Sequence, residues 1–299
     1  MEIKKYATQF LPEWTKQVPF QVKAIAIKEA CEAFWAAKGR PHFRSRKNPT
    51  QSCFIPKTAI KTNSIYPRIP GKNLNFKEDI PEDLCDSRLL WRNGSWFLCA
   101  SHKEKLVRDA RTKPETVALD PGIRSFISFY SPNYSGKIGI DTSETMFKYF
   151  LALDNLIGRI AKTKNKKKKR SLKKAAKRLR EKILNLITEL HYKTANLLCK
   201  NFTTVILPTF ETKDMANKST RKIRSKSVRA MMGLSFYKFR QRLEWIALKL
   251  GCKVVITTEE YTSKTHPQTG VINNRLGGAK TVKLVDGSRA DRDIVGAFN

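Results

Sequence analysis

Acidic residues are scarce in this chain. Only 26 of its 299 residues are Asp or Glu, whereas 59 are Lys or Arg, so the formal net charge is +33. A compact chain with this charge repels itself unless a polyanion neutralises it, and the common polyanions are nucleic acid and anionic membranes. Strong basic charge is typical of nucleic-acid-binding proteins, so the composition favours nucleic acid over a lysine-rich protein without such a partner.

Long apolar runs and closely spaced cysteine pairs are also absent. No stretch approaches the roughly 18–20 uninterrupted apolar residues of a membrane-spanning helix. The first ten residues contain lysines without an apolar block behind them, so we expect no signal peptide. None of the six cysteines belongs to a CxxC pair. We therefore expect reduced thiols, in a cytoplasmic and nucleoid-associated protein or, in a eukaryotic or viral setting, a nuclear one.

Glycine and proline are not abundant, with 14 and 13 residues, which excludes a collagen-like or low-complexity chain. Hydrophobic residues make up 40% of the sequence, which is enough to build a core and excludes wholesale disorder. A chain of this length predicts roughly two domains.

The positive charge is concentrated in a few segments. Residues 159–182 contain fourteen Lys or Arg and a single acid, Glu181, and further basic stretches cover 40–47 and 213–229. A lysine-bearing helix face is commonly only solvated, but this density favours contacts with nucleic-acid phosphates. The residues that we expect to bind nucleic acid are Arg44, Arg46, Lys47, Lys166, Lys167, Lys168, Lys169, Arg170, Lys173, Lys174, Arg221, Lys222 and Arg224.

Hydrophobic spacing predicts a helix and then a small β unit in the first third of the chain. Pro19 and the apolar residues behind it, which recur with a helical period, indicate a helix over 19–37. Asn93-Gly94 lies between two β-like pieces and is a strong hairpin signal. The expected strands lie at 53–55, 89–91 and 95–100.

Beyond residue 113, strands and long helices alternate, which predicts an α/β arrangement with several strands in one sheet. A long apolar stripe from Leu172 to Leu197 predicts one helix, and a second is expected over 236–250, where Gly251 is placed to end it. The expected strands lie at 116–119, 126–130, 137–140, 203–207 and 254–257. The remaining segments are a polar basic loop at 211–229, a stretch of little periodicity at 261–290 and the start of a helix at 291–299.

The few acids of this half lie at the ends of predicted elements. They are Asp120 after a strand, Glu259 and Glu260 after the last strand, and Asp291 and Asp293 at the start of the final helix. Functional sites of α/β domains gather at such positions. Carboxylates that converge there repel one another unless a divalent cation lies between them. Mg²⁺ or Mn²⁺ held by carboxylates in a basic protein is the two-metal arrangement of nucleases and polymerases.

Each of these acids also has a purely structural interpretation. Asp120-Pro121-Gly122 alone is more often a turn than a metal ligand, and an Asp at a helix start is usually a cap. Glu259-Glu260 alone is compatible with a solvated surface pair. Only their shared placement at element ends supports the hypothesis of a metal site.

Several short segments occur together in this chain. They are Leu119-Asp120-Pro121-Gly122-Ile123-Arg124, Tyr261-Thr262-Ser263-Lys264-Thr265, Asp291-Arg292-Asp293 followed by Gly296-Ala297, and earlier pieces at 39–47, 86–89 and 94–98. Together they resemble the TnpB family, the first three its RuvC segments, and the resemblance spans nearly the whole chain. TnpB proteins are transposon-encoded and related to type V CRISPR effectors and to the Fanzor nucleases.

The resemblance implies an RNase H-like (RuvC) nuclease domain over 113–299, with a helical insertion at about 143–200 and a degenerate zinc-ribbon loop at about 261–290. Before it, the resemblance implies a partial helical recognition region over 1–47 and a β-barrel-like wedge domain over 48–112. The implied cofactor is Mg²⁺ or Mn²⁺, and the implied partners are a guide RNA and a target DNA.

Carried over by position, Asp120 is the first catalytic carboxylate and Asp293 the third. Most members carry the middle Glu at the end of the strand at 203–207, where this chain has Pro208 and, three residues later, Glu211. The Fanzor-like branch places it just before the Tyr-Thr-Ser-Lys-Thr segment. Neighbouring residues at a strand end face opposite sides, so only one of two adjacent acids is expected to point at the metals. The resemblance therefore implies Asp120, Glu259 and Asp293 as Mg²⁺ ligands, with Glu260, Glu211 and Asp291 as weaker candidates.

The chain departs from the family at the zinc ribbon and at its ends. Many members have two CxxC pairs there, whereas this chain has only His266 near the first pair and no cysteine over 283–290. Zinc normally takes four Cys or His ligands, so we predict no structural zinc. Relatives extend further on both sides, so we expect this chain to be short at both ends relative to the family.

The implied function is that of a transposon-associated, RNA-guided DNA endonuclease that cleaves phosphodiester bonds by two-metal catalysis. One alternative is a cleavage-dead or truncated TnpB-like RNA- and DNA-binding protein, which the retained acidic trio argues against and the missing ends argue for. The other alternative is a DNA transposase, because RNase H-like folds also support strand transfer.

Overall fold

The computed structural model divides the chain into two compact units, Met1–Lys105 and Leu106–Asn299, which we describe separately. No helix in the part of the chain that the structure describes is long and apolar enough to cross a membrane. The described residues are 9–37, 39–42, 45, 48, 50–61, 64–66, 76–103, 115–210, 216, 224–258, 262, 264–274, 276 and 279–299.

The first unit contains one long helix and a three-stranded antiparallel sheet. Helix α2 covers Phe20–Ala36, and strands β1 (Thr50–Ile55), β4 (Ser87–Arg92) and β5 (Ser95–Cys99) pair in that order. The φ angles of Asn93 and Gly94 are 46° and 83°, which confirms the predicted Asn-Gly hairpin. The shorter elements are η1 (Glu13–Gln17), η2 (Lys57–Ala59), β2 (Ile60–Lys61) and β3 (Ser64–Ile65).

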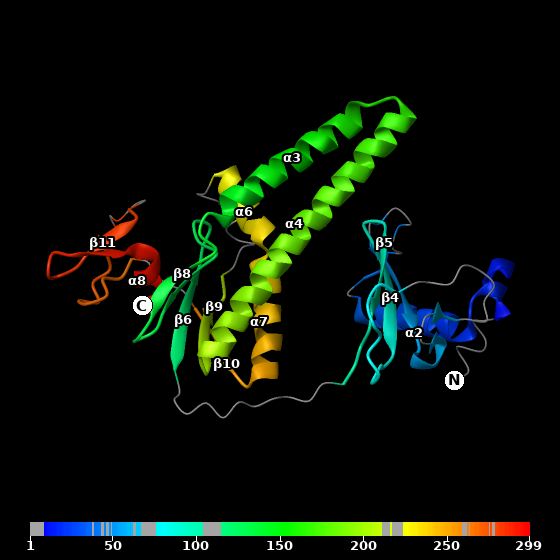
Figure 1. Cartoon of the computed structure of the whole chain (residues 1–299), viewed down its shortest axis with the longest axis horizontal. Helices are drawn as coiled ribbons and strands as arrows, with labels where there is room; N and C mark the ends of the chain where they lie inside the picture. Colours follow the sequence, from blue (N-terminus) through cyan, green and yellow to red (C-terminus); the bar gives the residue numbers. More distant parts are fainter. Residues whose placement is uncertain are drawn as a thin grey trace. The chain divides into compact units, whose positions relative to one another are not determined.

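The second unit is built on a five-stranded mixed sheet with the order β10-β9-β6-β7-β8 (Figure 1). Strands β6, β7 and β8 form an antiparallel meander, whereas β9 runs parallel to β6 and β10 parallel to β9. This sheet confirms the predicted α/β arrangement. The strands are β6 (Thr116–Pro121), β7 (Ile127–Tyr130), β8 (Ser135–Ile138), β9 (Thr204–Pro208) and β10 (Lys253–Thr257).

Helices cover both faces of this sheet. The second half of α4, together with α6 and α7, buries its apolar residues against one face, where Val117 and Leu119 of β6 and Phe239 of α7 share one core. Helix α8 contacts β6, β7 and β8 and lies on the opposite side of the sheet from α4 and α7 (Figure 1). The helices are α3 (Thr142–Lys162), α4 (Lys166–Asn201), α6 (Ser225–Leu234), α7 (Phe236–Leu250) and α8 (Arg292–Phe298).

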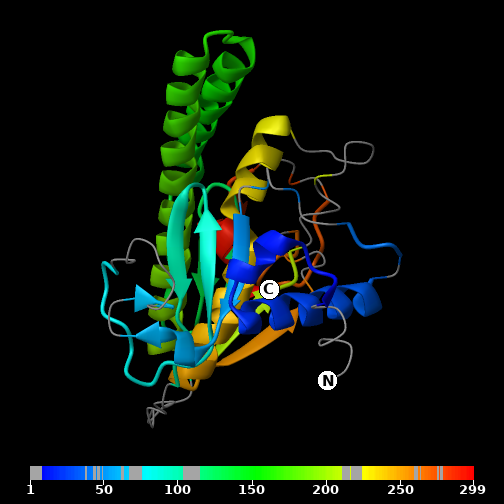
Figure 2. The same ribbon diagram turned by 90° about the vertical axis from the view of Figure 1, so that its right-hand side faces the viewer.

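Helices α3 and α4 form a long hairpin that extends away from the sheet (Figure 2). They are held together by their own apolar cluster, which includes Met146 and Phe150 of α3 and Ala176 and Ile187 of α4. The lysines of the first half of α4 lie off this stripe, as the sequence pattern predicts. Leu197, which we place in the stripe on the sequence alone, is 49% exposed, because its neighbour Leu198 occupies the buried position instead.

The structure corrects three sequence predictions for the second unit: one loop limit, one hairpin that the sequence did not predict and one strand limit. Helix α6 begins at Ser225, inside the predicted loop at 211–229, because Met231 and Leu234 become buried against the sheet core only in the tertiary structure. Strands β11 (Thr281–Lys283) and β12 (Arg289–Asp291) form an antiparallel hairpin that begins inside 261–290 and ends at Asp291, and strands of three residues are too short to show a period in the sequence. Strand β8 ends at Ile138 and not at residue 140, because Gly139 turns the chain with a φ of +68°.

The buried His191 joins three parts of the core of the second unit. Its Nε2 hydrogen donates to the carbonyl oxygen of Leu234 at 2.8 Å, and its Nδ1 accepts from the Arg242 guanidinium at 2.6 Å. The ring also stacks on Phe126 with 5.2 Å between ring centroids. This arrangement fits only the neutral imidazole. Burial, and then the charges of Arg242 and Lys238, lower the pKa of His191 to about 4, against the Leu234 hydrogen bond, which raises it.

We expect the free energy of unfolding to fall on acidification because of His191. The unfolded chain binds a proton near the ordinary pKa of 6.5 and the folded chain only near 4, so the stabilisation is full above pH 6.5 and lost as the pH falls towards 4. The loss is about 3 kcal/mol, at 1.36 kcal/mol per pKa unit. Urea denaturation at several pH values measures it, with His191→Phe as the non-titrating control. An identical pH slope between 6.5 and 5 in both proteins would contradict this assignment.

Candidate active site

The register of the meander brings Asp120, Ser128 and Lys137 into one row across the sheet. Asp120 of β6 pairs with Ser128 of β7, which pairs with Lys137 of β8. Residues that oppose each other in antiparallel strands have their side chains on the same face. Because Val117 and Leu119 face the α4–α7 core, Asp120 points to the other face, which α8 covers.

Helix α8 brings two further carboxylates to this face. Asp291 is the N-cap of the helix, and its side chain accepts a hydrogen bond from the backbone N–H of Asp293 at 3.0 Å. Asp293 lies in the first turn, where the positive end of the helix dipole favours an anion. The cap interpretation from the sequence is therefore confirmed for Asp291, whereas the Asp293 side chain faces the sheet.

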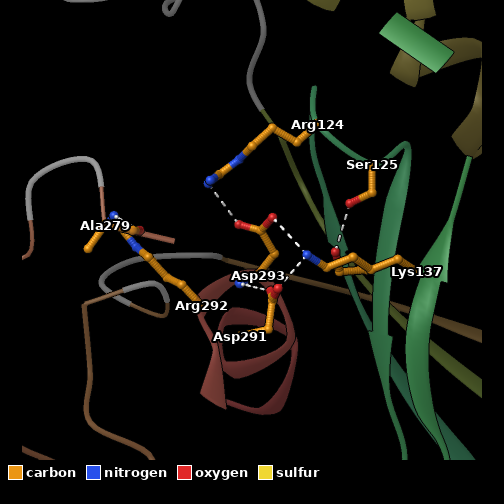
Figure 3. A network of polar contacts seen from close by, with 8 residues as sticks. Arg124, Ser125, Lys137, Ala279, Asp291, Arg292 and Asp293 are labelled. Carbon is orange, nitrogen blue, oxygen red and sulfur yellow. Dashed lines mark hydrogen bonds and ion pairs between the residues drawn. The ribbon is translucent and has the colours of Figure 1, made fainter. Parts of the chain in front are cut away.

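Two cations, one from the sheet and one from the turn between β6 and β7, contact these carboxylates (Figure 3). The ammonium of Lys137 lies 2.6 Å from Oδ2 of Asp291 and 3.6 Å from Oδ2 of Asp293. The Arg124 guanidinium donates to the second oxygen of Asp293, Oδ1, at 3.1 Å. Lys137 thus places one positive charge between the two carboxylates, and Arg124 closes the site from the β6–β7 turn.

The site is partly shielded from solvent, which strengthens these charge interactions. The side chains of Lys137 and Asp293 are 24% and 21% exposed. For Asp291, partial burial raises the pKa of the carboxyl, but the Lys137 hydrogen bond and charge and the backbone N–H donors of α8 outweigh it and lower the pKa below its ordinary value. Asp291 therefore remains ionised well below neutral pH.

Close packing at the end of β8 fixes where Lys137 lies. A Cβ on Gly139 would approach Cβ of Phe126 to 2.8 Å, and the φ of +68° at this position is one that side-chain-bearing residues rarely adopt. The backbone N–H of Phe126 donates to the Gly139 carbonyl at 3.3 Å, so β8 is tied to the start of β7. Buried Ser125 and Ser128, with hydroxyls 3.0 Å apart, brace the same turn, which carries Arg124.

The donors present here fit a hard divalent cation. All are carboxylate oxygens, the ligands that Mg²⁺ and Mn²⁺ prefer, and the lysine ammonium shows that a cation is accommodated between Asp291 and Asp293. Among the described residues, no three His, Cys, Asp or Glu side chains gather closely enough to hold a metal by themselves. The described carboxylates therefore do not by themselves form a complete set of metal ligands.

The structure describes only three of the predicted site acids, Asp120, Asp291 and Asp293. It brings Asp291 and Asp293 together and places Asp120 on the same sheet face. Glu259, Glu260 and Glu211 lie outside the described residues. Sequence reasoning misses the parts that Arg124 and Lys137 play. The sequence carries no signal for Lys137, whose role arises only from strand register, and Arg124 stands out only as part of the motif around Asp120.

The predicted nucleic-acid-binding residues are described mainly on α4. Its first half extends from the N-cap Asn165, whose side chain accepts from the Lys168 N–H at 3.0 Å. The side chains of Lys166, Lys167, Lys168, Arg170, Lys173 and Lys174 are exposed, Lys169 is half-buried, and Arg224 before α6 is exposed. Arg44, Arg46, Lys47, Arg221 and Lys222 lie outside the described residues.

His266, the one residue left of the zinc-ribbon pattern, makes hydrogen bonds within its loop. Its Nε2 lies 3.0 Å from the Lys283 carbonyl oxygen, and its Nδ1 accepts from the N–H groups of Gln268 and Thr269 at 3.3 Å each. Both ring nitrogens are therefore engaged with backbone groups of the 264–285 segment. The absence of a zinc site stays a prediction.

We expect Lys137 to stabilise the metal-free protein. In Lys137→Met the two carboxylates lose their shared ammonium, so the melting temperature in EDTA should fall by about 2–4 °C, corresponding to about 1 kcal/mol for a partly exposed pair. Added Mn²⁺ should then raise the melting temperature of the variant more than that of the wild type, because the ion replaces the missing charge. Lys137→Arg, which keeps the charge, is the control. Equal responses to Mn²⁺ in all three proteins would contradict this role.

Comparison with known proteins identifies the family. The chain is 31% identical over 307 aligned residues to a protein of Paramecium bursaria Chlorella virus 1 that carries a transposase name, and the match covers 96% of this chain and 69% of that protein. A TnpB-like protein of Acanthamoeba polyphaga mimivirus is 30% identical over 190 residues, which are 60% of this chain and 36% of that protein. This chain belongs to the TnpB family. TnpB proteins are transposon-associated nucleases related to the type V effectors.

Two further comparisons concern one part of the chain and its fold. Residues 236–299, which contain α7, β10 and α8, match the family described as Cas12f1-like, TNB domain. The fold resembles that of Cas12f1 in its complex with sgRNA and target DNA, with a TM-score of 0.51 and 15% identity, over 72% of this chain and 44% of that one. At this identity the likeness concerns the fold alone.

Proposed function

We propose that this TnpB protein is an RNA-guided DNA endonuclease that cleaves phosphodiester bonds with two divalent metal ions. The observation that carries the proposal is that Asp120, from the middle of the sheet, lies on the sheet face that α8 covers, and that Asp293, from the first turn of α8, points to this face. Asp293 lies beside Lys137 and Arg124, and Asp120 lies on the same sheet face, so the face combines carboxylates that suit cations with donors that suit phosphate oxygens.

We propose that the second unit is an RNase H-like (RuvC) domain. An antiparallel meander followed by two parallel strands supports this assignment, as does the position of Asp120 on its first strand. In the same way, the helix and antiparallel sheet of the first unit are assigned as a partial recognition region and a wedge domain.

In this mechanism Asp120, Glu259 and Asp293 would hold two Mg²⁺ ions. Bound there, Mg²⁺ would supply a nucleophile at neutral pH and charge stabilisation for the phosphate. Asp291 keeps α8 in place through its cap, so that Asp293 presents its carboxylate to the sheet. Without the metal, Lys137 and Arg124 are paired with Asp293. With metal bound to Asp293, the N–H donors of both side chains would be available to the non-bridging oxygens of the scissile phosphate.

The basic hairpin would hold the nucleic acids. The exposed cations of α4 extend over about four turns of helix without an intervening acid until Glu181, which suits a track of phosphates. Pairing with the guide RNA, and not side chains of the protein, would read the DNA sequence. Localisation would follow the DNA, either nucleoid-associated or nuclear.

The test is cleavage of a guided double-stranded DNA by the protein loaded with RNA transcribed from the adjacent transposon end. We expect cleavage with Mg²⁺ or Mn²⁺ and none in EDTA. A DNA transposase is the second candidate, favoured by the transposase name of the Chlorella virus relative. Joining of transposon ends to a new DNA, without guided cutting, would establish strand transfer instead. Tight binding of both nucleic acids without any cutting would establish a cleavage-dead protein.

A further inference from the structure

Helix α7 presents an exposed aromatic face that no described element covers. Tyr237, Trp245 and Leu248 are 70%, 52% and 66% exposed, whereas Phe239 and Leu243 on the other side of the helix are buried in the core. On the neighbouring α4, Tyr192 is 39% exposed and packs against Arg242 of α7. We call Tyr192, Tyr237, Trp245 and Leu248 the α7 face.

Cations accompany the aromatic rings of this face. The Lys249 ammonium lies 5.5 Å from the centroid of the Trp245 ring, and the Arg242 guanidinium lies 5.4 Å from that of Tyr192. The one acid of α7, Glu244, is paired with Arg240 at 2.8 Å. The α7 face therefore combines flat aromatic surfaces with a net positive charge, the combination on which nucleic-acid bases stack.

The α7 face lies on the opposite side of the sheet from the carboxylates. Helix α7 packs on the face that Val117 and Leu119 line, whereas Asp120 and α8 are on the other (Figure 1). A nucleic-acid strand that lies along α7 is thus separated by the sheet from the carboxylates that we propose to cut DNA. Tyr237 and Trp245 are eight residues apart, about 12 Å along the helix, which is far enough for the two rings to stack on different bases of one nucleic-acid strand.

We infer that the α7 face binds unpaired bases of single-stranded RNA. A second copy of the chain is a poor occupant, because each copy carries a formal charge of +33 and the cations at this face would repel one another. The choice of RNA over DNA rests on the proposed function, in which the DNA strand occupies the carboxylate site and the RNA is not cut. The inference adds a stacking surface to the phosphate contacts of the α3–α4 hairpin.

The experiment measures binding of a fluorescent oligouridine RNA by anisotropy in EDTA, where no cutting occurs. We expect Tyr237→Ala and Trp245→Ala each to weaken binding by about tenfold, and the double variant by more, as for the loss of base stacking. Tyr237→Phe and Trp245→Phe should retain most of the affinity. Tyr134→Ala, which removes an aromatic residue that is 61% exposed elsewhere in the second unit, is the matched control and should bind as the wild type does.

The outcomes separate this inference from the proposed function. Unchanged RNA affinity in the double variant, with an unchanged melting temperature, would overturn the inference and leave the cleavage proposal as it stands. If the double variant self-associates less than the wild type but binds RNA equally well, the α7 face belongs to a protein interface. If the wild type prefers oligothymidine to oligouridine, the face binds DNA. Either result overturns the inference. Ultraviolet cross-linking of the wild type, with the adduct mapped to Tyr237 or Trp245, supports the inference even if the alanine variants do not fold. Absence of guided cleavage in the wild type would instead count against the proposed function.

Discussion

Asp120→Asn and Asp293→Asn should each abolish Mg²⁺-dependent DNA cleavage, by at least about a thousandfold. That factor corresponds to about 4 kcal/mol in the activation free energy, at 1.36 kcal/mol per tenfold change in rate. The expected size follows from the position of these carboxylates on one sheet face, where each would be a direct ligand. Asn keeps the shape of the side chain and removes its charge, so the change acts on metal binding and not on packing. Single-turnover cleavage at saturating RNA and DNA measures it.

Asp291→Asn is the matched control for this prediction. Asn caps a helix about as well as Asp, so the bond to the Asp293 N–H is kept while the charge next to Lys137 is lost. We expect this variant to lose far less activity than Asp293→Asn. Nucleic-acid binding in EDTA should be the same in all three variants. Wild-type cleavage by Asp120→Asn would refute its assignment, and equal losses in Asp291→Asn and Asp293→Asn would show that Asp291 also binds metal.

Neutralising the start of α4 should have the next largest effect, on nucleic-acid affinity. The variant replaces Lys166, Lys167, Lys168 and Lys169, of which three are exposed and one half-buried, by Gln. At physiological salt, each phosphate contact that releases counterions raises the nucleic-acid affinity about fivefold. Loss of four such contacts therefore lowers the affinity by about two to three orders of magnitude. The slope of log affinity against log salt should decrease by about four units for the same reason.

The control for α4 replaces the same four lysines by Arg, which keeps every charge and the helix propensity. This variant should bind with nearly wild-type affinity and salt dependence. Filter binding over a range of salt concentrations, with a duplex DNA and with a structured RNA as separate probes, tells which nucleic acid the hairpin holds. An unchanged salt slope in the Gln variant would show that these lysines are merely solvated.

The sequence by itself determined most of the elements. The helical period predicted α2 and α7, the Asn93-Gly94 pair predicted the β4–β5 hairpin, and Gly251 predicted the end of α7, where its φ is 70°. Each of these features depends only on residues that are close together in the sequence, so a short stretch of sequence is enough to predict it. The net charge and the position of the acids at element ends are likewise features of composition and residue order alone, and from them we predict a nucleic-acid partner and a metal site.

Only the tertiary structure decided which contacts Asp291 and Asp293 make. The residue pattern places Asp291 and Asp293 alike at the start of the last helix, and only the family resemblance ranks Asp293 first. In the structure, Asp291 caps the helix end and Asp293 faces the sheet. Lys137 joins the site through the register of β6, β7 and β8, because a slip of one residue would move every side chain to the opposite face. Arg124 joins the site from the turn between β6 and β7. The α7 face also depends on the tertiary structure. The hydrophobic period of α7 predicts its buried side, but only the packing of α4 and α6 around it decides that Tyr237 and Trp245 stay exposed.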